Sequence, residues 1–221
     1  MICMYEKEKE QVVEACRRIA QDGLTVGSWG NISVRADDGK IAITPSGKNY
    51  NKTEKEDIVI TSIDGDILEG HLTPSSERLM HYEIYRKRSD VKAIVHTHSV
   101  YSSILSVVDD DLPAITEDVI MILGRSVRVA KYAMTGTVDL AKNVVEALGD
   151  SNATIMKNHG AVAVGKDIDR AMAAAYVLEK SAKIYVMAKL LGKVSAVPDD
   201  DVDKLIGISE AYLKQWDRWK K

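Results

Sequence analysis

Two histidines separated by one residue end an apolar segment of the chain. His96 and His98 close the run VKAIVHTH, which begins at Val91 and is typical of a strand. Alternate residues of a strand point to the same face, so both imidazoles are expected on one side. Two imidazoles on one face can chelate a metal ion; the alternative is a polar strand end with two exposed histidines.

A third histidine, His159, lies in the turn KNHG between two apolar runs. The glycine that follows it, Gly160, permits close approach of the backbone. Three imidazoles make the ligand set of an open catalytic zinc site, which keeps one position for water or substrate. Sequence spacing leaves their convergence open. We expect a divalent ion, Zn²⁺ first and Mn²⁺, Co²⁺ or Fe²⁺ as alternatives, at His96, His98 and His159.

An acidic residue follows a pair of serines in the motif TPSSE. The hydroxyls and amides of Ser75 and Ser76 could bind a phosphate at a helix start, or they could simply cap that helix. Glu77 alone would be read as a solvated acid in the first helical turn. Beside three metal-binding histidines, it becomes a candidate base or fourth metal ligand.

Two turns of small residues are further candidates for binding an anion. Gly30-Asn31 and Ser46-Gly47 flank the ends of predicted strands, where successive backbone amides can form a nest for an anion. Taken individually, they are ordinary hairpin and loop residues.

The remaining two of the five histidines show no pattern of metal ligands. His71 lies in a predicted loop. His81 lies within a predicted helix and has no second ligand at helical spacing. We interpret both as structural or exposed histidines.

The elements that must position these residues follow from hydrophobic periodicity and turn residues. Helices are predicted over residues 5–21, 73–88, 137–148, 168–191 and about 202–219, and strands over 32–34, 41–43, 58–60, 91–98, 127–129, 153–156 and 161–164. Helices do not separate every strand, so a largely antiparallel sheet between helices is expected rather than a doubly wound parallel one. We expect residues 1–221 to form a single domain.

Composition excludes several classes of function. The 221 residues are 45% hydrophobic and carry a net charge of −3, so no global basic field attracts nucleic acid or anionic lipid. No run is long enough to span a bilayer. The two cysteines, Cys3 and Cys16, and the absence of a signal peptide favour a reducing, cytoplasmic location.

Five motifs in fixed order resemble the class II aldolase and adducin-head family. They are GSWGNISVR, ITPSGK, TPSSE, VHTHS and KNHGAVAVG, and the resemblance extends from about Val12 to Leu191. Within the family it is strongest to the L-fuculose-1-phosphate aldolases. The resemblance implies a three-layer α/β/α sandwich with a mainly antiparallel central sheet.

The resemblance also implies a role for each candidate residue. His96, His98 and His159 would hold zinc, and Glu77 would be a metal ligand and the catalytic acid/base. The substrate phosphate would bind at Gly30, Asn31, Ser46, Gly47, Ser75 and Ser76. The implied reaction is reversible cleavage of a ketose 1-phosphate, such as L-fuculose 1-phosphate or a deoxypentulose 1-phosphate, to dihydroxyacetone phosphate and an aldehyde. The implied assembly is a cyclic homotetramer with active sites between subunits.

Alternatives within the family remain open. The related epimerases carry Asp where this chain has Glu77, which favours an aldolase. The fuculose aldolases have Tyr shortly after a PAI segment, whereas here Glu117 follows Pro113-Ala114-Ile115 closely and resembles the methylthioribulose-1-phosphate dehydratases. Tyr212 is a candidate for the missing phenol, on a C-terminal helix that would cover the site. A non-catalytic, adducin-like interaction module is disfavoured by the intact ligand set.

Overall fold

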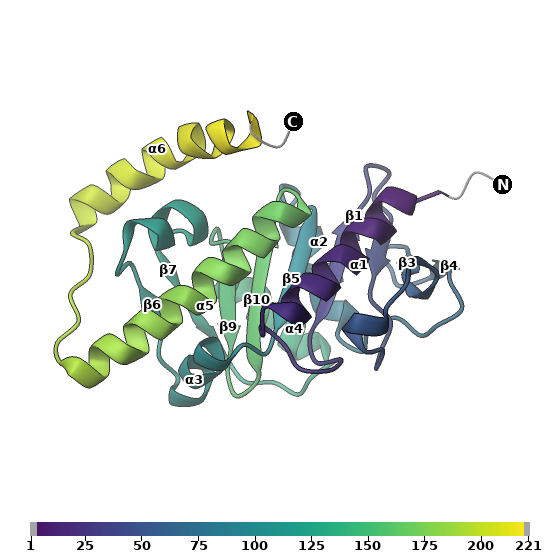
Figure 1. Ribbon diagram of the computed structural model, residues 1–221, viewed down its shortest axis with the longest axis horizontal. Coiled ribbons are helices and arrows are strands. Elements are labelled where there is room, and N and C mark those ends of the chain that lie inside the picture. The colour runs from purple at the N-terminus through teal and green to yellow at the C-terminus, as the bar shows by residue number, and fades with distance from the viewer. Residues whose placement is uncertain (1–3, 219–221) are drawn as a thin grey trace.

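The chain folds into three layers around one central sheet (Figure 1). The structure is a computed structural model that describes residues 4–218. Its sheet has eight strands in the order β4-β3-β2-β1-β5-β10-β9-β8. These strands are β1 (Asn31–Arg35), β2 (Ile41–Ile43), β3 (Val59–Thr61), β4 (Ile67–Glu69), β5 (Ala93–Thr97), β8 (Val129–Ala130), β9 (Ala153–Met156) and β10 (Gly160–Gly165). Only β8 and β9 pair in parallel, so the predicted α/β sandwich with a mainly antiparallel sheet is confirmed.

Helices cover both faces of the sheet. They are α1 (Glu6–Gln21), α2 (Arg78–Lys87), α3 (Val100–Val108), α4 (Val138–Leu148), α5 (Ile168–Leu191) and α6 (Asp199–Arg218), with short turns η1 (Tyr50–Lys52), η2 (Lys55–Asp57) and η3 (Val119–Leu123). A small second sheet pairs β6 (Leu112–Pro113) with β7 (Ser126–Val127). Helices α1, α3 and α5 share one hydrophobic core with the sheet, and α2 and α4 share the other.

Strand alternation turns a row of polar side chains toward α2. Ile32 and Val34 of β1 belong to the core under α1 and α5. Asn31 and Ser33 alternate with these two residues and therefore face the opposite side of the sheet. On that side, Ile94 of β5 belongs to the core under α2 and α4. His96 lies on the same face of β5 as Ile94. The fold thus buries several polar groups between the sheet and α2.

Two glycines allow the backbone to approach β5 closely on either side. A Cβ atom on Gly30 would lie 2.5 Å from the carbonyl oxygen of His96, and one on Gly160 would lie 2.5 Å from that of Thr97. Gly30 also has a φ of +98°, which disfavours any other residue. The strand that carries His96 is therefore held between two positions that require glycine.

Helix α2 begins later than predicted. The spacing around Thr73-Pro74 predicts a helix from residue 73, but the first helical residue is Arg78. Residues 73–75 pair with another segment instead, since Ser75 donates its N–H to the Thr44 carbonyl at 3.0 Å and Ser46 donates to the Thr73 carbonyl at 2.9 Å, and residues 76–77 form a turn before the helix. This pairing brings the TPSS and TPSG segments side by side.

One helix has no local sequence signal. The segment after His98 reads only as apolar, yet Val100–Val108 forms α3. Its first-turn amides are bonded by a distant side chain, since the carboxylate of Glu179 accepts hydrogen bonds from the N–H groups of Tyr101 and Ser102, both at 2.9 Å. The strand predicted over residues 127–129 is likewise divided between β7 and β8.

The C-terminal helix was predicted over about 202–219 and spans Asp199–Arg218, with Trp219 outside the described residues. It packs against η3, where Val202 is buried with Ala114 and Ile120. Figure 1 shows α6 in yellow along one side of the molecule. Within residues 4–218, no helix has both the length and the apolar composition that crossing a membrane requires.

Candidate metal centre and active site

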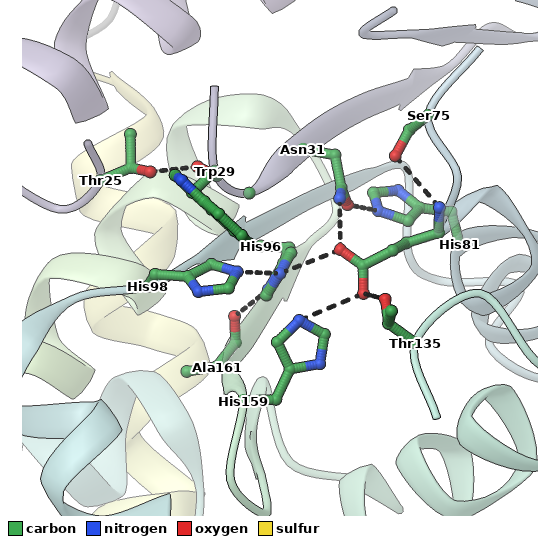
Figure 2. Close-up of polar contacts among 12 residues, drawn as sticks. Thr25, Trp29, Asn31, Ser75, His81, His96, His98, Thr135, His159 and Ala161 are labelled. Carbon is green, nitrogen blue, oxygen red and sulfur yellow. Dashed lines mark hydrogen bonds and ion pairs between the residues drawn. The ribbon is translucent and has the colours of Figure 1, made fainter. Parts of the chain in front are cut away.

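The three predicted histidine ligands converge (Figure 2). One ring nitrogen from each of His96, His98 and His159 lies within 4.8 Å of the others, and the Nε2 atoms of His96 and His98 are 3.0 Å apart. His96 and His98 come from the end of β5, and His159 comes from the turn before β10. Three imidazole nitrogens around one point are a donor set that fits a divalent ion such as zinc.

The protein fixes which nitrogen His96 presents to the centre. Its Nδ1 lies 2.9 Å from the carbonyl oxygen of Ala161, which can only accept, so Nδ1 carries the proton. The lone pair of Nε2 is then directed at the cluster. A backbone carbonyl behind a histidine is the usual way in which proteins orient a metal ligand.

The surroundings keep two of the histidines neutral. Burial, together with the nearby charge of His96, lowers the pKa of His98 to about 3 and that of His159 to about 4. Burial also lowers the pKa of His96, but the charge and hydrogen bond of Glu77 outweigh that effect and raise it overall. Neutral imidazoles are the form that binds metal ions.

Glu77 lies directly beside the histidine cluster and is only 6% exposed. Its Oε2 is 3.2 Å from Nε2 of His96, and its Oε1 is 3.4 Å from Nε2 of His159. Two neutral donors hold the same carboxylate: the Asn31 amide donates to Oε2 at 2.8 Å, and the Thr135 hydroxyl donates to Oε1 at 3.0 Å. The predicted neighbourhood of Glu77 and the histidines is thus present.

These contacts keep the carboxylate ionised. Burial alone would raise the pKa of Glu77, but the charge and hydrogen bond of His96, with smaller contributions from His159 and Asn31, hold that pKa well below its ordinary value. Glu77 is therefore an anion fixed against the histidine cluster, and it can exchange a proton with a group placed between them.

The six residues predicted to bind a phosphate line one cavity with Glu77. The cavity has a volume of about 470 Å³ and also contains His98 and His159 in its wall. The residues in question are Gly30, Asn31, Ser46, Gly47, Ser75 and Ser76. Their role in phosphate binding stays a prediction. The side-chain amide of Asn31 is engaged at both ends, by Glu77 and by His81.

The lining of this cavity also includes residues that the sequence reasoning missed, among them Thr135, Trp29 and Met134. Thr135 lies in the loop before α4 and bonds Glu77, and the aromatic rings of Trp29 and His98 are 5.5 Å apart. Trp29 is 66% exposed, and Met134 also lines the opening. The aromatic residue within GSWGN was the one sequence signal that could have indicated a binding site here. Nothing in the sequence around Thr135 indicated its contact with Glu77.

The structure places Glu117 and Tyr212 away from this cavity. Both line a separate hollow of about 720 Å³ that α5 and η3 also border. The lining of the histidine cavity, among the described residues, includes none from α6. A catalytic role for Glu117 or Tyr212 stays a prediction.

Removal of one histidine should release the metal without unfolding the chain. We predict that His159→Ala lowers bound zinc at least tenfold after dialysis, because only two imidazoles remain. Zinc per chain is measured by atomic emission. His71→Ala, which removes an exposed histidine outside the cluster, is the matched control. Full zinc content in His159→Ala would show that His159 is not a ligand.

Comparison with known proteins gives a consistent result. Residues 10–186 match the family described as Class II Aldolase and Adducin N-terminal domain. The chain is 38% identical to 5-deoxy-D-ribulose 1-phosphate aldolase of Bacillus thuringiensis serovar kurstaki, over 96% of this chain and 100% of that protein. It is also 38% identical to L-fuculose phosphate aldolase of Methanococcus maripaludis, over 81% of this chain and 97% of that protein.

A solved structure of L-fuculose 1-phosphate aldolase superimposes with a TM-score of 0.89 and 34% sequence identity, over 91% of this chain and 95% of that one. The match of the family to most of the chain agrees with the fold, the ordered motifs and the histidine cluster. The chain belongs to the class II aldolase and adducin family.

Proposed function

We propose that this protein is a zinc-dependent class II aldolase whose substrate is a deoxyketose 1-phosphate. The reaction class follows from the family and from relatives that are themselves sugar-phosphate aldolases. A 5-deoxypentulose 1-phosphate is the first candidate, because the relative named for 5-deoxy-D-ribulose 1-phosphate aligns over its whole length. L-fuculose 1-phosphate is the second. Two cysteines, one of them buried in α1, support the further proposal of a cytoplasmic location.

The placement of Glu77 carries this proposal. An aldolase of this class must move a proton to or from the carbon beside a ketone, and it must stabilise the negative charge that results. Glu77 is an ionised carboxylate within 3.4 Å of two of the three histidines. The base and the proposed metal site therefore border the same small volume.

In the cleavage direction, the bond between C3 and C4 of the ketose breaks. The C4 hydroxyl loses its proton, which in the net balance passes to the ionised carboxylate of Glu77; C4 becomes the aldehyde carbon, and the bonding electrons pass to C3 and the adjacent ketone as an enediolate. Protonated Glu77 then transfers this proton to C3, which completes dihydroxyacetone phosphate and leaves the carboxylate ionised again. Bound at His96, His98 and His159, zinc would supply a Lewis acid for the ketone oxygen.

The phosphate is proposed to bind where the two extended segments meet. Ser75 and Ser76 lie just before Glu77, the residue that precedes α2, and Ser75 is bonded to Thr44 in the segment that contains Ser46 and Gly47. Amides and hydroxyls before a helix N-terminus favour an anion. Anchoring the phosphate there would hold the reacting carbon next to Glu77.

We also propose the homotetramer that the family resemblance implies. An apolar patch supports association: Val107 and Val108 of α3 are exposed beside α5, whose Leu190 and Leu191 are exposed as well. Figure 1 shows α3 against the C-terminal half of α5. Native mass spectrometry should give four times the chain mass of 24.4 kDa. A monomer at micromolar concentration would contradict the proposal.

The reaction is tested directly with purified, zinc-loaded protein. Incubation with 5-deoxyribulose 1-phosphate or L-fuculose 1-phosphate should release dihydroxyacetone phosphate and an aldehyde. Treatment with a chelator should abolish release, and added zinc should restore it. If neither compound gave metal-dependent release of dihydroxyacetone phosphate, the proposal would be contradicted.

The mass of the product separates the alternative reactions in the same experiment. Two fragments indicate an aldolase, whereas loss of one water would indicate the dehydratase that Glu117 suggests. An unchanged mass with altered chromatographic retention would indicate an epimerase.

Glu77→Gln should lower kcat at least about 100-fold, the size expected for loss of a general acid/base. The amide keeps the shape of the side chain, so the melting temperature and zinc content should stay close to those of the unchanged protein. Glu83→Gln is the control. It removes the carboxylate of Glu83, which pairs with Arg86 within α2, the helix that Glu77 precedes. Unchanged kcat in Glu77→Gln would refute the assigned role.

A further inference from the structure

His81 is fully buried between α2 and the sheet, and both of its ring nitrogens are bonded. Its Nε2 lies 2.5 Å from Oδ1 of Asn31, and its Nδ1 lies 2.6 Å from Oγ of Ser33. Asn31 and Ser33 are alternate residues of β1 and so face the same side. The imidazole therefore bridges two polar groups on one strand face. His81 belongs neither to the histidine cluster nor to the residues that line the cavity.

The charge of Glu77 determines the direction of every hydrogen bond in this chain of contacts. An ionised carboxylate only accepts, so the Asn31 group that lies 2.8 Å from Oε2 must be its NH₂. Oδ1 of Asn31 then faces His81 and can only accept. Nε2 of His81 must consequently carry a proton and donate it to Asn31 (Figure 2).

The far side of the ring agrees with this assignment. A neutral imidazole with its proton on Nε2 accepts at Nδ1, so the Ser33 hydroxyl donates to it. The Tyr85 hydroxyl lies 2.8 Å from Ser33 Oγ and 3.1 Å from the Ser33 carbonyl oxygen, to either of which it can donate. Burial and the charge of His96 lower the pKa of His81 to about 3, which keeps the ring neutral.

The geometry points to His81 as a positioning residue that orients the Asn31 amide, so that Asn31 donates to Oε2 of Glu77. This inference rests on the proposed acid/base role of Glu77. Without a donor at Nε2, the amide of Asn31 is held in this orientation by its bond to Glu77 alone. Rotation of the amide would place Oδ1 against the Glu77 carboxylate, and two acceptors repel each other. Glu77 would then lose the donor that holds Oε2.

Two substitutions separate the two sides of the ring. The amide of His81→Gln can reach the position of Nε2 and still donate to Asn31, whereas that of His81→Asn reaches only the position of Nδ1, beside Ser33. Each variant keeps one buried contact and loses the other, so the two should be destabilised to a similar extent. Only His81→Asn removes the link to Glu77.

The proton transfer at the substrate carbon can be measured with dihydroxyacetone phosphate alone, without the aldehyde. In D₂O the enzyme should exchange a hydrogen on the hydroxymethyl carbon of dihydroxyacetone phosphate for deuterium, which proton NMR follows. We expect His81→Asn to slow this exchange and kcat for cleavage by at least tenfold. KM, zinc content and the melting temperature should match those of His81→Gln, whose exchange rate should stay within about threefold of the unchanged protein.

Tyr82→Phe is the control for loss of a buried hydrogen bond in the same helix. The hydroxyl of Tyr82 donates to Oγ1 of Thr61 at 2.9 Å, away from Asn31. Tyr82→Phe should lower the melting temperature and leave the rate of deuterium exchange unchanged. If His81→Asn gives no folded protein, Asn31→Ala tests the same link and should slow exchange by a similar factor.

The outcomes are distinguishable from failure of the proposed function. Wild-type exchange in His81→Asn, or in Asn31→Ala where that variant is needed, would overturn the inference while Glu77→Gln remained inactive. Equal slowing in folded His81→Gln and His81→Asn would overturn the assignment of the donor to Nε2. Wild-type exchange in Glu77→Gln would instead contradict the acid/base role itself.

Discussion

A buried carboxylate stays ionised only where donors and positive charge replace the water that it has lost. Glu77 meets this condition through Asn31 and Thr135, which donate to its two oxygens, and through His96 and His159 beyond them. These partners come from β1, the loop before α4, the end of β5 and the turn before β10. The ability of Glu77 to carry a proton therefore depends on the whole central part of the sheet.

The register of that sheet explains how the partners meet. Strand β5 lies between β1 and β10, and His96 is paired with Asn31 on one side and Val162 on the other. Gly30 and Gly160 allow the neighbouring chain to approach β5 where a side chain would collide with its carbonyl oxygens. The same alternation that buries Ile32 and Val34 turns polar residues of β1 toward α2. The hydrophobic pattern and the polar site are thus two consequences of one strand placement.

The sequence allowed prediction of the parts of the site whose signal is local. The HxH spacing on a strand, the NHG turn and the acid after paired serines each indicate chemistry within a few residues, and the resemblance joined them. The sequence predicted His81 to be structural or exposed, but its contact with Asn31 and that of Thr135 with Glu77 were missed, because these partners are 50 and 58 positions away. Helix α3 was missed for the same reason, since its capping carboxylate lies 77 to 78 positions along the chain. Long-range hydrogen bonds leave no periodic pattern, whereas strand and helix faces do.

The most direct test of this account is a crystal structure of the zinc-loaded protein with phosphoglycolohydroxamate, a mimic of the enediolate. The account predicts zinc bound by nitrogens of His96, His98 and His159 at about 2.0–2.1 Å. The phosphate of the mimic should lie against the Ser46-Gly47 and Ser75-Ser76 segments, with Glu77 in hydrogen-bond contact with the hydroxamate. Zinc held by other residues, or a mimic bound out of reach of Glu77, would contradict it.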